Sequence, residues 1–197
     1  MIIFFLALTC SAVFKSMNFR TLFFIVSLVL IFSGCRGKIY TYGESFAELM
    51  KNDDGLFRGV NIGDSPEEIQ QSEGSGPAES SDDLITYNGP IGDLGTYTIR
   101  YGFENGRLFE ILVDATFDER QEGQKMLLGF RDYFNDTFGP FQKESGFLVW
   151  RTKPGAKNQD VRIEMVDESE FADFGNWSLS MYHQIPSKVI ETTGPVL

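Results

Sequence analysis

The stretch "YTIRYGFENGRLFEILVDATF", residues 97–117, decides the fold of this chain. Its first part alternates apolar and polar residues from Tyr97 to Phe103, and its second part does so from Leu108 to Phe117. Alternation with a period of two is typical of a β-strand that buries one face. The residues between the two parts, "ENGR", have the composition of a turn, so the stretch predicts an antiparallel hairpin.

The register of this hairpin depends on the length of its turn. A two-residue Asn-Gly turn would place Tyr101 opposite Glu110 and would mix apolar and polar faces. A three-residue loop over 104–106 that ends in a G1 bulge places Tyr101 opposite Phe109 instead. We therefore expect the three-residue loop, which also sets Arg100 opposite Glu110 on the other face.

Helical signals flank the hairpin on both sides. Before it, "ESFAELMKN" (44–52) predicts a short helix, and Ser65, Pro66 and Glu68 form a capping box that predicts a second one. After it, a long helix is expected, with Asp118 as its cap and Gln121 as the partner of that cap. The Gly139-Pro140 pair ends this helix. Four apolar residues recur in it at helical spacing: Leu127, Phe130, Phe134 and Phe138.

The remaining chain predicts three more strands and with them the fold class. They are "GFLVWRTK" (146–153), "DVRIEMV" (160–166) and "WSLSMYHQI" (177–185). With few crossovers between strands, the sheet should be mostly antiparallel. We expect an α+β two-layer sandwich in the order helix, strands, helix, strands, with the helices on one face and Phe134 packed against the hairpin. One domain should span 44–188, followed by a tail over 189–197.

The N-terminal segment has the order of a secretory signal. Arg20 supplies a positive charge, an eleven-residue apolar run extends from Leu22 to Phe32, and small residues and a cysteine follow as "SGC" (33–35). A transmembrane anchor would need about 20 apolar residues, more than the run offers. A complete signal begins at Met17, so we expect translation to start there and residues 1–16 to be superfluous.

This segment resembles the signal of bacterial lipoproteins, which ends in a small residue and an invariant cysteine. Phe32 departs from that pattern because leucine is usual at its position. The resemblance implies that residues 1–34 are cleaved, that the Cys35 thiol carries lipid, and that 35–43 form a tether. It also implies an envelope protein that is anchored to a membrane and faces the periplasm. Plain secretion with an incidental cysteine, or an uncleaved anchor, are the alternatives.

Charge and cysteine content exclude several function classes. Lys15 and Arg20 precede Cys35 and no acidic residue does, so the rest of the chain holds 15 basic and 28 acidic residues. Phosphate backbones would repel such a body, so we expect no nucleic-acid partner. No cysteine follows Cys35, which excludes an internal disulfide, a thiolate metal site and a cysteine nucleophile there.

The segment "GVNIGDSPEEI" (59–69) carries a second resemblance. It is similar to the glycine, capping-box and helix opening of small lipoproteins in the barrel-assembly-lipoprotein and β-lactamase-inhibitor-protein superfamily. The order of a helix followed by a meander of strands, over about residues 59–185, fits as well. The resemblance implies a non-enzymatic envelope module that binds another protein.

Few residues suggest chemistry. His183, the sole histidine, shares the phase of Trp177 and Met181, so it should lie at the end of a core-facing row. The acidic pairs at 53–54 and 82–83 and the loop "DESEFAD" (167–173) lack calcium-loop spacing. We expect no cofactor, no metal and no catalysis. An envelope hydrolase that uses acidic residues, or a structural module steadied by calcium, are the alternatives.

The expected binding site is the sheet face that the helices leave uncovered. Several adjoining apolar groups ringed by charge often mark an interaction surface. Parity places six residues there as the contact for another envelope protein: Arg100, Leu108, Glu110, Leu112, Phe147 and Val149. The alternative is that the loop over 73–95 folds across this face and buries it.

Overall fold

The computed structural model describes residues 38–152, 160–169 and 174–183. All of the described residues belong to one compact unit. The expected signal and Cys35 lie outside the described residues. No helix within the described ranges is long and apolar enough to cross a membrane.

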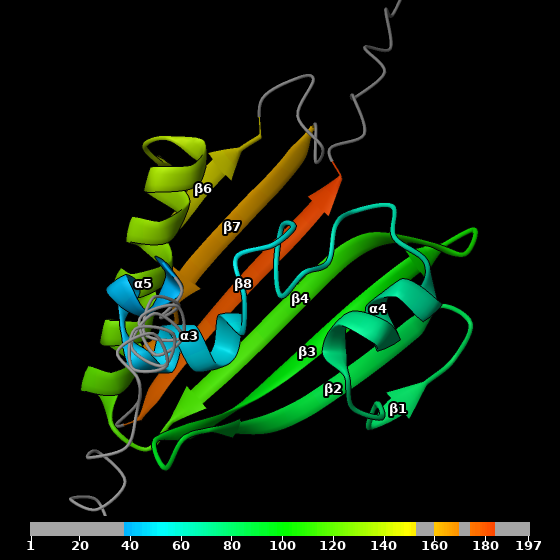
Figure 1. The fold of residues 1–197 in the computed structure, drawn as a ribbon. Helices are drawn as coiled ribbons and strands as arrows, with labels where there is room; N and C mark the ends of the chain where they lie inside the picture. The colour runs from blue at the N-terminus through cyan, green and yellow to red at the C-terminus, as the bar shows by residue number, and fades with distance from the viewer. Residues whose placement is uncertain (1–37, 153–159, 170–173, 184–197) are drawn as a thin grey trace, which may run out of the picture. The chain divides into compact units, whose positions relative to one another are not determined.

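An eight-stranded sheet forms the centre of the unit (Figure 1). Its spatial order is β1-β2-β3-β4-β8-β7-β6-β5, and every neighbouring pair is antiparallel. The α+β class and the antiparallel sheet are thus confirmed. The strands are β1 (Glu79–Ser80), β2 (Leu84–Ile91), β3 (Gly95–Glu104), β4 (Arg107–Phe117), β5 (Gln142–Glu144), β6 (Phe147–Arg151), β7 (Val161–Asp167) and β8 (Gly175–His183).

The described helices are the 3-10 helix η1 (Lys38–Tyr42) and the α-helices α3 (Glu44–Met50), α4 (Pro66–Glu73) and α5 (Arg120–Phe138). In Figure 1, α3 and α4 are seen in front of the sheet and α5 at its left side. Helix α5 contacts β4, β6, β7 and β8, and α3 contacts α5 and β2. Residues 38–42 were expected in a tether, but Ile39 is 6% exposed and belongs to the core.

The two short helices form where the sequence predicts them. In α4, the Ser65 Oγ accepts a hydrogen bond from the Glu68 N–H at 3.4 Å, and the Ser65 N–H donates to Glu68 Oε2 at 2.8 Å. Both halves of the capping box are present, and Pro66 is the first helical residue. Gly74 ends α4 in the left-handed conformation, with φ 66°.

The long helix begins differently from the prediction. Its N-cap is Glu119, which makes no side-chain capping bond, and the helix starts at Arg120. Asp118 precedes the cap and remains tied to the sheet, since its N–H donates to the Leu94 carbonyl at 3.2 Å. The end is as predicted, since α5 stops at Phe138 and Gly139 follows with φ 94°.

The apolar stripe of α5 packs on a different part of the sheet from the one predicted. Phe130 and Phe134 are fully buried, but the Phe134 ring lies 5.3 Å from that of Trp150 in β6, and the Phe130 ring lies 4.9 Å from that of Trp177 in β8. The expected packing of Phe134 against the hairpin row is therefore wrong. Strand β8 inserts beside β4, so the helix that follows β4 extends over β8, β7 and β6 instead.

The hairpin has a two-residue turn and a bulge inside β4. Asn105 and Gly106 have φ of 52° and 71°, the left-handed pair that this kind of turn requires. Further along, Gly102 pairs with Glu110 while Phe103 pairs with Leu108, which leaves Phe109 as the extra residue. The expected three-residue loop is wrong, although the parity argument was right that one residue must be extra.

The segment over 73–95 extends the sheet rather than covering its outer face. It forms β1 and β2, and β2 pairs with β3 along its whole length, from Leu84 opposite Gly102 to Ile91 opposite Gly95. The alternative that this segment buries the outer face is therefore wrong. Its apolar residues alternate, and Ile85, Tyr87 and Ile91 point into the core.

Candidate functional site

The predicted binding face is reorganised by the register of the hairpin. Arg100 lies opposite Leu112, not opposite Glu110. Its guanidinium forms an ion pair with Asp114, so the expected pairing with Glu110 is wrong. Arg100 and Asp114 keep nearly half of their side-chain surface in water, where such a pair adds about 0–1 kcal/mol.

Two of the six predicted contact residues are buried. Leu108 is 1% exposed because the bulge turns it into the core, whereas Phe109, expected in the core, is 40% exposed. Val149 is also buried, although it alternates with Leu148 and Trp150, which pack against the core. Leu108 and Val149 therefore cannot offer a free contact surface as predicted.

The outer face does not hold one continuous apolar patch. Across the sheet, Leu112 lies opposite Ser180, Ser180 opposite Glu164, and Glu164 opposite Val149. Three strand spacings separate Leu112 from Val149, which is roughly 14 Å at about 4.8 Å per spacing. Phe147 lies beyond this gap as well, on the same strand as Val149.

A charged cluster occupies the gap between the two apolar parts. Arg162 pairs with Glu164 at 2.5 Å and with Glu144 at 2.8 Å, and Arg151 pairs with Glu144 at 2.9 Å. Hydrogen bonds from Arg151 and Arg162 hold the pKa of Glu144 below its usual value. The structure thus brings Arg100, Leu112 and Glu110 together and leaves Phe147 and Val149 apart from them.

A cleft of about 250 Å³ opens where β4 begins and β8 ends. Phe109 and His183 line it with Ile62, and the rest of its wall comes from Gly63, Glu104, Arg107 and Leu108. His183 ends the row of Trp177 and Met181 as predicted, but its side chain is exposed rather than part of the core. Among the described residues, the lining holds no serine, threonine or cysteine that the imidazole could activate as a nucleophile.

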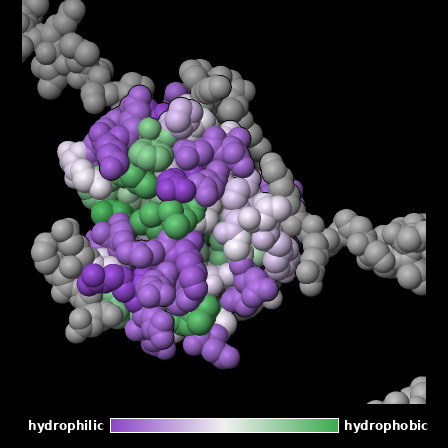
Figure 2. All heavy atoms as spheres, turned by 90° about the vertical axis from the view of Figure 1, so that its left-hand side faces the viewer, coloured by the Kyte–Doolittle hydropathy of each residue, from purple (hydrophilic) through white to green (hydrophobic). Residues whose placement is uncertain are grey.

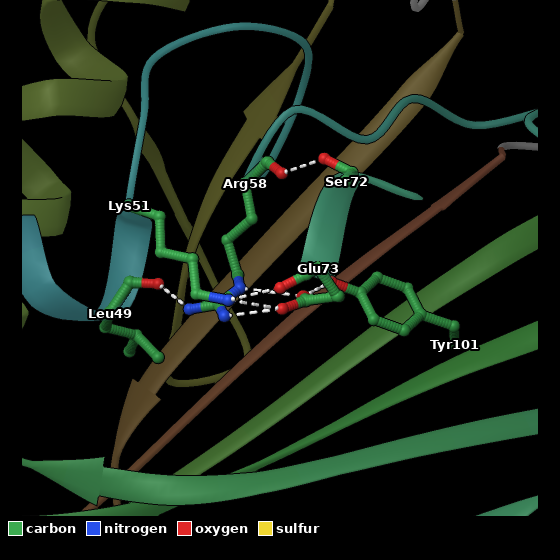
Figure 3. A network of polar contacts seen from close by, with 6 residues as sticks. All are labelled: Leu49, Lys51, Arg58, Ser72, Glu73 and Tyr101. Atoms are coloured by element: carbon green, nitrogen blue, oxygen red, sulfur yellow. Dashed lines mark hydrogen bonds and ion pairs between the residues drawn. The ribbon is translucent and has the colours of Figure 1, made fainter. Parts of the chain in front are cut away.

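A buried ionic network lies under the loop that joins α3 to α4 (Figure 3). The Arg58 Nε and Nη2 donate to Glu73 Oε1 and Oε2 at 2.8 and 2.6 Å, which makes a bidentate pair. The Tyr101 hydroxyl donates to Glu73 Oε1 at 2.6 Å, and Lys51 Nζ donates to Glu73 Oε2 at 2.8 Å. Arg58 also donates to the Leu49 carbonyl, and its guanidinium lies 5.3 Å from the Tyr97 ring centre.

Protein groups compensate the charges of the network. Burial raises the pKa of Glu73, but the hydrogen bond and charge of Arg58 outweigh this effect and, with Lys51 and Tyr101, keep the pKa below its usual value. Burial and the charge of Glu73 raise the pKa of Tyr101 far above its usual value, so its hydroxyl stays protonated and donates. Each carboxylate oxygen has protein donors, and the arrangement acts as a structural clamp.

Sequence reasoning missed this clamp, although one signal was present. Arg58 stands inside the apolar segment "LFRGV" (56–60), and Phe57 and Val60 pair across a tight turn. Arg58 and Gly59 have φ of 54° and 82°, so an arginine stands where asparagine is the usual choice. A lone charge in that setting indicates a buried partner, but nothing in the sequence identifies Glu73.

A second cleft, of about 410 Å³, lies between α5 and the junction of η1 with α3. Tyr42 and Phe46 line it from one side and Met126 and Leu128 from the other. The chain can approach α5 this closely because residue 129 is glycine: a Cβ there would lie 2.6 Å from the Tyr42 carbonyl oxygen. Burial and the hydrogen bond to Asp136, 2.7 Å long, raise the pKa of the Tyr42 hydroxyl to about 12.

The acidic loop expected at 167–173 is partly described, and its described part is hydrogen-bonded to Asn176 in β8. Ser169 Oγ donates to the Asn176 carbonyl and accepts from the Asn176 N–H at 2.7 Å, and Glu168 accepts from the Asn176 amide at 3.1 Å. Residues 170–173 lie outside the described residues. Across the part of the chain that is described, no three His, Cys, Asp or Glu side chains are grouped so as to hold a metal ion.

Comparison of the chain with protein-family models, curated proteins and solved structures gives no match. The site must therefore be interpreted from its own geometry.

Proposed function

We propose that this chain is a lipid-anchored protein of a bacterial cell envelope that faces the periplasm and acts by binding another envelope protein. The order of the N-terminal segment carries the proposal: a charged start, an apolar run that ends at Phe32, two small residues and Cys35. The first of the described elements begins at Lys38, three residues after the cysteine. Two or three acyl chains on Cys35, at about 0.8 kcal/mol per buried methylene, would hold such a domain on a bilayer.

For binding, we propose a two-layer sandwich in the order helix, strands, helix, strands, with its helices on one face and the other left for a partner. The burial pattern supports this proposal. In β4, β7 and β8 the residues that face the helices are buried, and the residues between them are mostly half-buried. The capping box at Ser65 fits the proposed kinship with the barrel-assembly-lipoprotein and β-lactamase-inhibitor-protein superfamily.

The contact for the partner is placed on the outer face of β3 and β4. Leu112 lies there half-buried, beside the Arg100–Asp114 ion pair and Glu110. Phe109 joins this group, because a Cβ on outward-facing Gly102 would lie 3.3 Å from its ring. An exposed aromatic beside a leucine and flanked by charges has the make-up of a small interaction surface.

The anchor is tested by Cys35→Ser in cells. The variant should leave the membrane fraction or keep its signal uncleaved, because it has no thiol for a lipid. Cys10→Ser is the matched control and should be processed and retained like the unaltered chain. The measurement is fractionation with mass spectrometry of the mature N-terminus. Full retention of Cys35→Ser, with a mature N-terminus elsewhere than residue 35, would reject the lipoprotein.

The contact surface is tested by the double variant Phe109→Ser and Leu112→Ser. Partners cross-linked in the native envelope should fall several-fold, because the variant removes both apolar groups while leaving the core intact. Leu94→Ser is the control, since Leu94 is similarly exposed but lies in the turn between β2 and β3. Equal cross-linking in the double variant would contradict this surface.

A further inference from the structure

The folded unit is attached very close to the proposed anchor. Ile39 is buried in the core, and it is the fourth residue after Cys35 along the chain. A fully extended chain spans at most about 3.6 Å per residue, so Ile39 lies within roughly 14 Å of the lipid-bearing residue. If Cys35 carries lipid, as proposed above, η1 must lie close to the bilayer surface.

Exposed apolar side chains gather on this part of the unit. Tyr40 in η1 is 55% exposed and Leu128 in α5 is 43% exposed, and these two elements contact each other. Helix α5 lies at the left of Figure 1, and Figure 2 shows apolar side chains gathered in a band between hydrophilic ones on the face seen from that side. Tyrosine is enriched at bilayer interfaces because its ring is amphipathic.

The cleft beside η1 has a floor and a rim that suit a lipid headgroup. Its floor is apolar, with Phe46 and Met126, while Lys125, Glu44 and Asp132 stand around it. Charges of both signs fit a zwitterionic headgroup better than an anionic one, which the acidic body of the chain would repel.

We infer that η1 and the adjoining face of α5 form a membrane-facing surface, in which Tyr40 and Leu128 enter the interface of a zwitterionic bilayer and the cleft takes a headgroup. This inference rests on the proposed lipid anchor and adds an orientation to it. The β3–β4 turn and the start of β2 lie at one end of their strands. Strand β4 leads into α5 at the opposite end. The proposed contact at Phe109 therefore lies away from the membrane-facing surface.

The test is hydroxyl-radical footprinting of the full chain in isolated bacterial membranes, read by mass spectrometry. The reference is the same chain with about forty Gly/Ser residues inserted after Arg36. Such a linker has a root-mean-square reach of about 35 Å and frees the unit from the surface. Labelling of Tyr40 and Leu128 should be at least three-fold lower in the unaltered chain than in the linker variant. Labelling of Leu84 and Phe109 should be equal in the two.

The outcomes separate the orientation from the anchor. Equal labelling of Tyr40 and Leu128 in the two chains, both recovered with the membrane, overturns the membrane-facing surface and leaves the anchor standing. Lower labelling at all four positions indicates general shielding and overturns it too. Absence of both chains from the membrane fraction overturns the anchor itself.

Discussion

The two halves of the sheet are covered in different ways. Over β6, β7 and β8, the nineteen-residue helix α5 packs through rings, with Phe134 on Trp150 and Phe130 on Trp177. Over β2 and β3, a loop and the eight-residue helix α4 are held by the Arg58–Glu73 pair and its bond from Tyr101. The first region is closed through packed rings, whereas in the second directed polar bonds supplement the packing of the buried loop residues Leu56, Phe57 and Val60.

The difference follows from what each covering segment can bury. Helix α5 is long enough to present several aromatic residues on one stripe, whereas α4 buries only Ile69 and Glu73. A segment with so little apolar surface gains little from the hydrophobic effect, and a bidentate ion pair fixes its position instead. Rings tolerate some repacking, but a buried charge tolerates no loss of its partner, and the two regions should therefore fail differently.

The largest effect should come from Glu73→Ala, which leaves the Arg58 charge buried without its partner. Breaking a buried pair costs about 3–5 kcal/mol, and this variant also removes the acceptor of Tyr101 and Lys51. We expect a loss of unfolding free energy at the upper end of that range in urea melts. The double variant Arg58→Met and Glu73→Leu should recover most of it. A loss below about 1 kcal/mol in the single variant would mean that water reaches the clamp.

The next largest effect should come from Phe134→Ala in the ring-packed region. Truncation of a fully buried phenylalanine costs about 3–5 kcal/mol, and we expect a loss smaller than that of Glu73→Ala because neighbouring rings can relax into the space. Leu128→Ala on the same helix is the control, and its exposed side chain should change the melt by less than about 0.5 kcal/mol. Equal losses in the two variants would contradict the packing described here.

Tyr101→Phe sharpens the comparison, since it removes one hydrogen bond from the clamp and keeps the ring. A hydrogen bond to a charged group contributes about 1.5–3 kcal/mol. The free energy of unfolding should fall by that amount in the unaltered chain. In the Arg58→Met and Glu73→Leu background the same substitution should have no more than a small effect, because its acceptor is gone. An equal loss in both backgrounds would show that the hydroxyl does not act through Glu73.

Ser65→Ala should have the smallest effect of the four, because it removes one cap from the helix that the clamp also holds. Loss of an N-cap serine costs typically about 1 kcal/mol. The measurement is the urea midpoint with an unchanged slope, and hydrogen exchange should show faster opening of α4 than of α5. Ser65→Asp, which can accept the same bond, is the control and should keep most of the stability.

The features that the sequence predicted correctly are those that depend on residues close together in the chain. The capping box at Ser65 needs only a span of four residues, and the end of α5 needs only Gly139. The stripe around Phe130 shows that α5 is amphipathic, but it does not show which strands the helix covers. That depends on β8 inserting beside β4, a pairing between residues far apart in the chain.

The outer face shows the limit of parity arguments. Alternation required one extra residue between Tyr101 and Ile111, and two places could hold it. Asn105 and Gly106 form the two-residue turn, because both adopt positive φ readily. The extra residue is therefore Phe109, inside β4. One misplaced residue exchanged a core residue for a surface residue and removed Leu108 from the candidate site.

The outermost strands have a consequence if the chain is confined to a membrane surface, as proposed above. Strand β1 has two residues and follows Pro77, and β5 has three residues and follows Pro140. Where β2 extends past β1, it carries Pro90, which lacks an N–H to donate. If copies were anchored side by side, long exposed sheet edges would favour pairing of one sheet with the next. Such short borders offer little template for it and keep neighbouring copies separate.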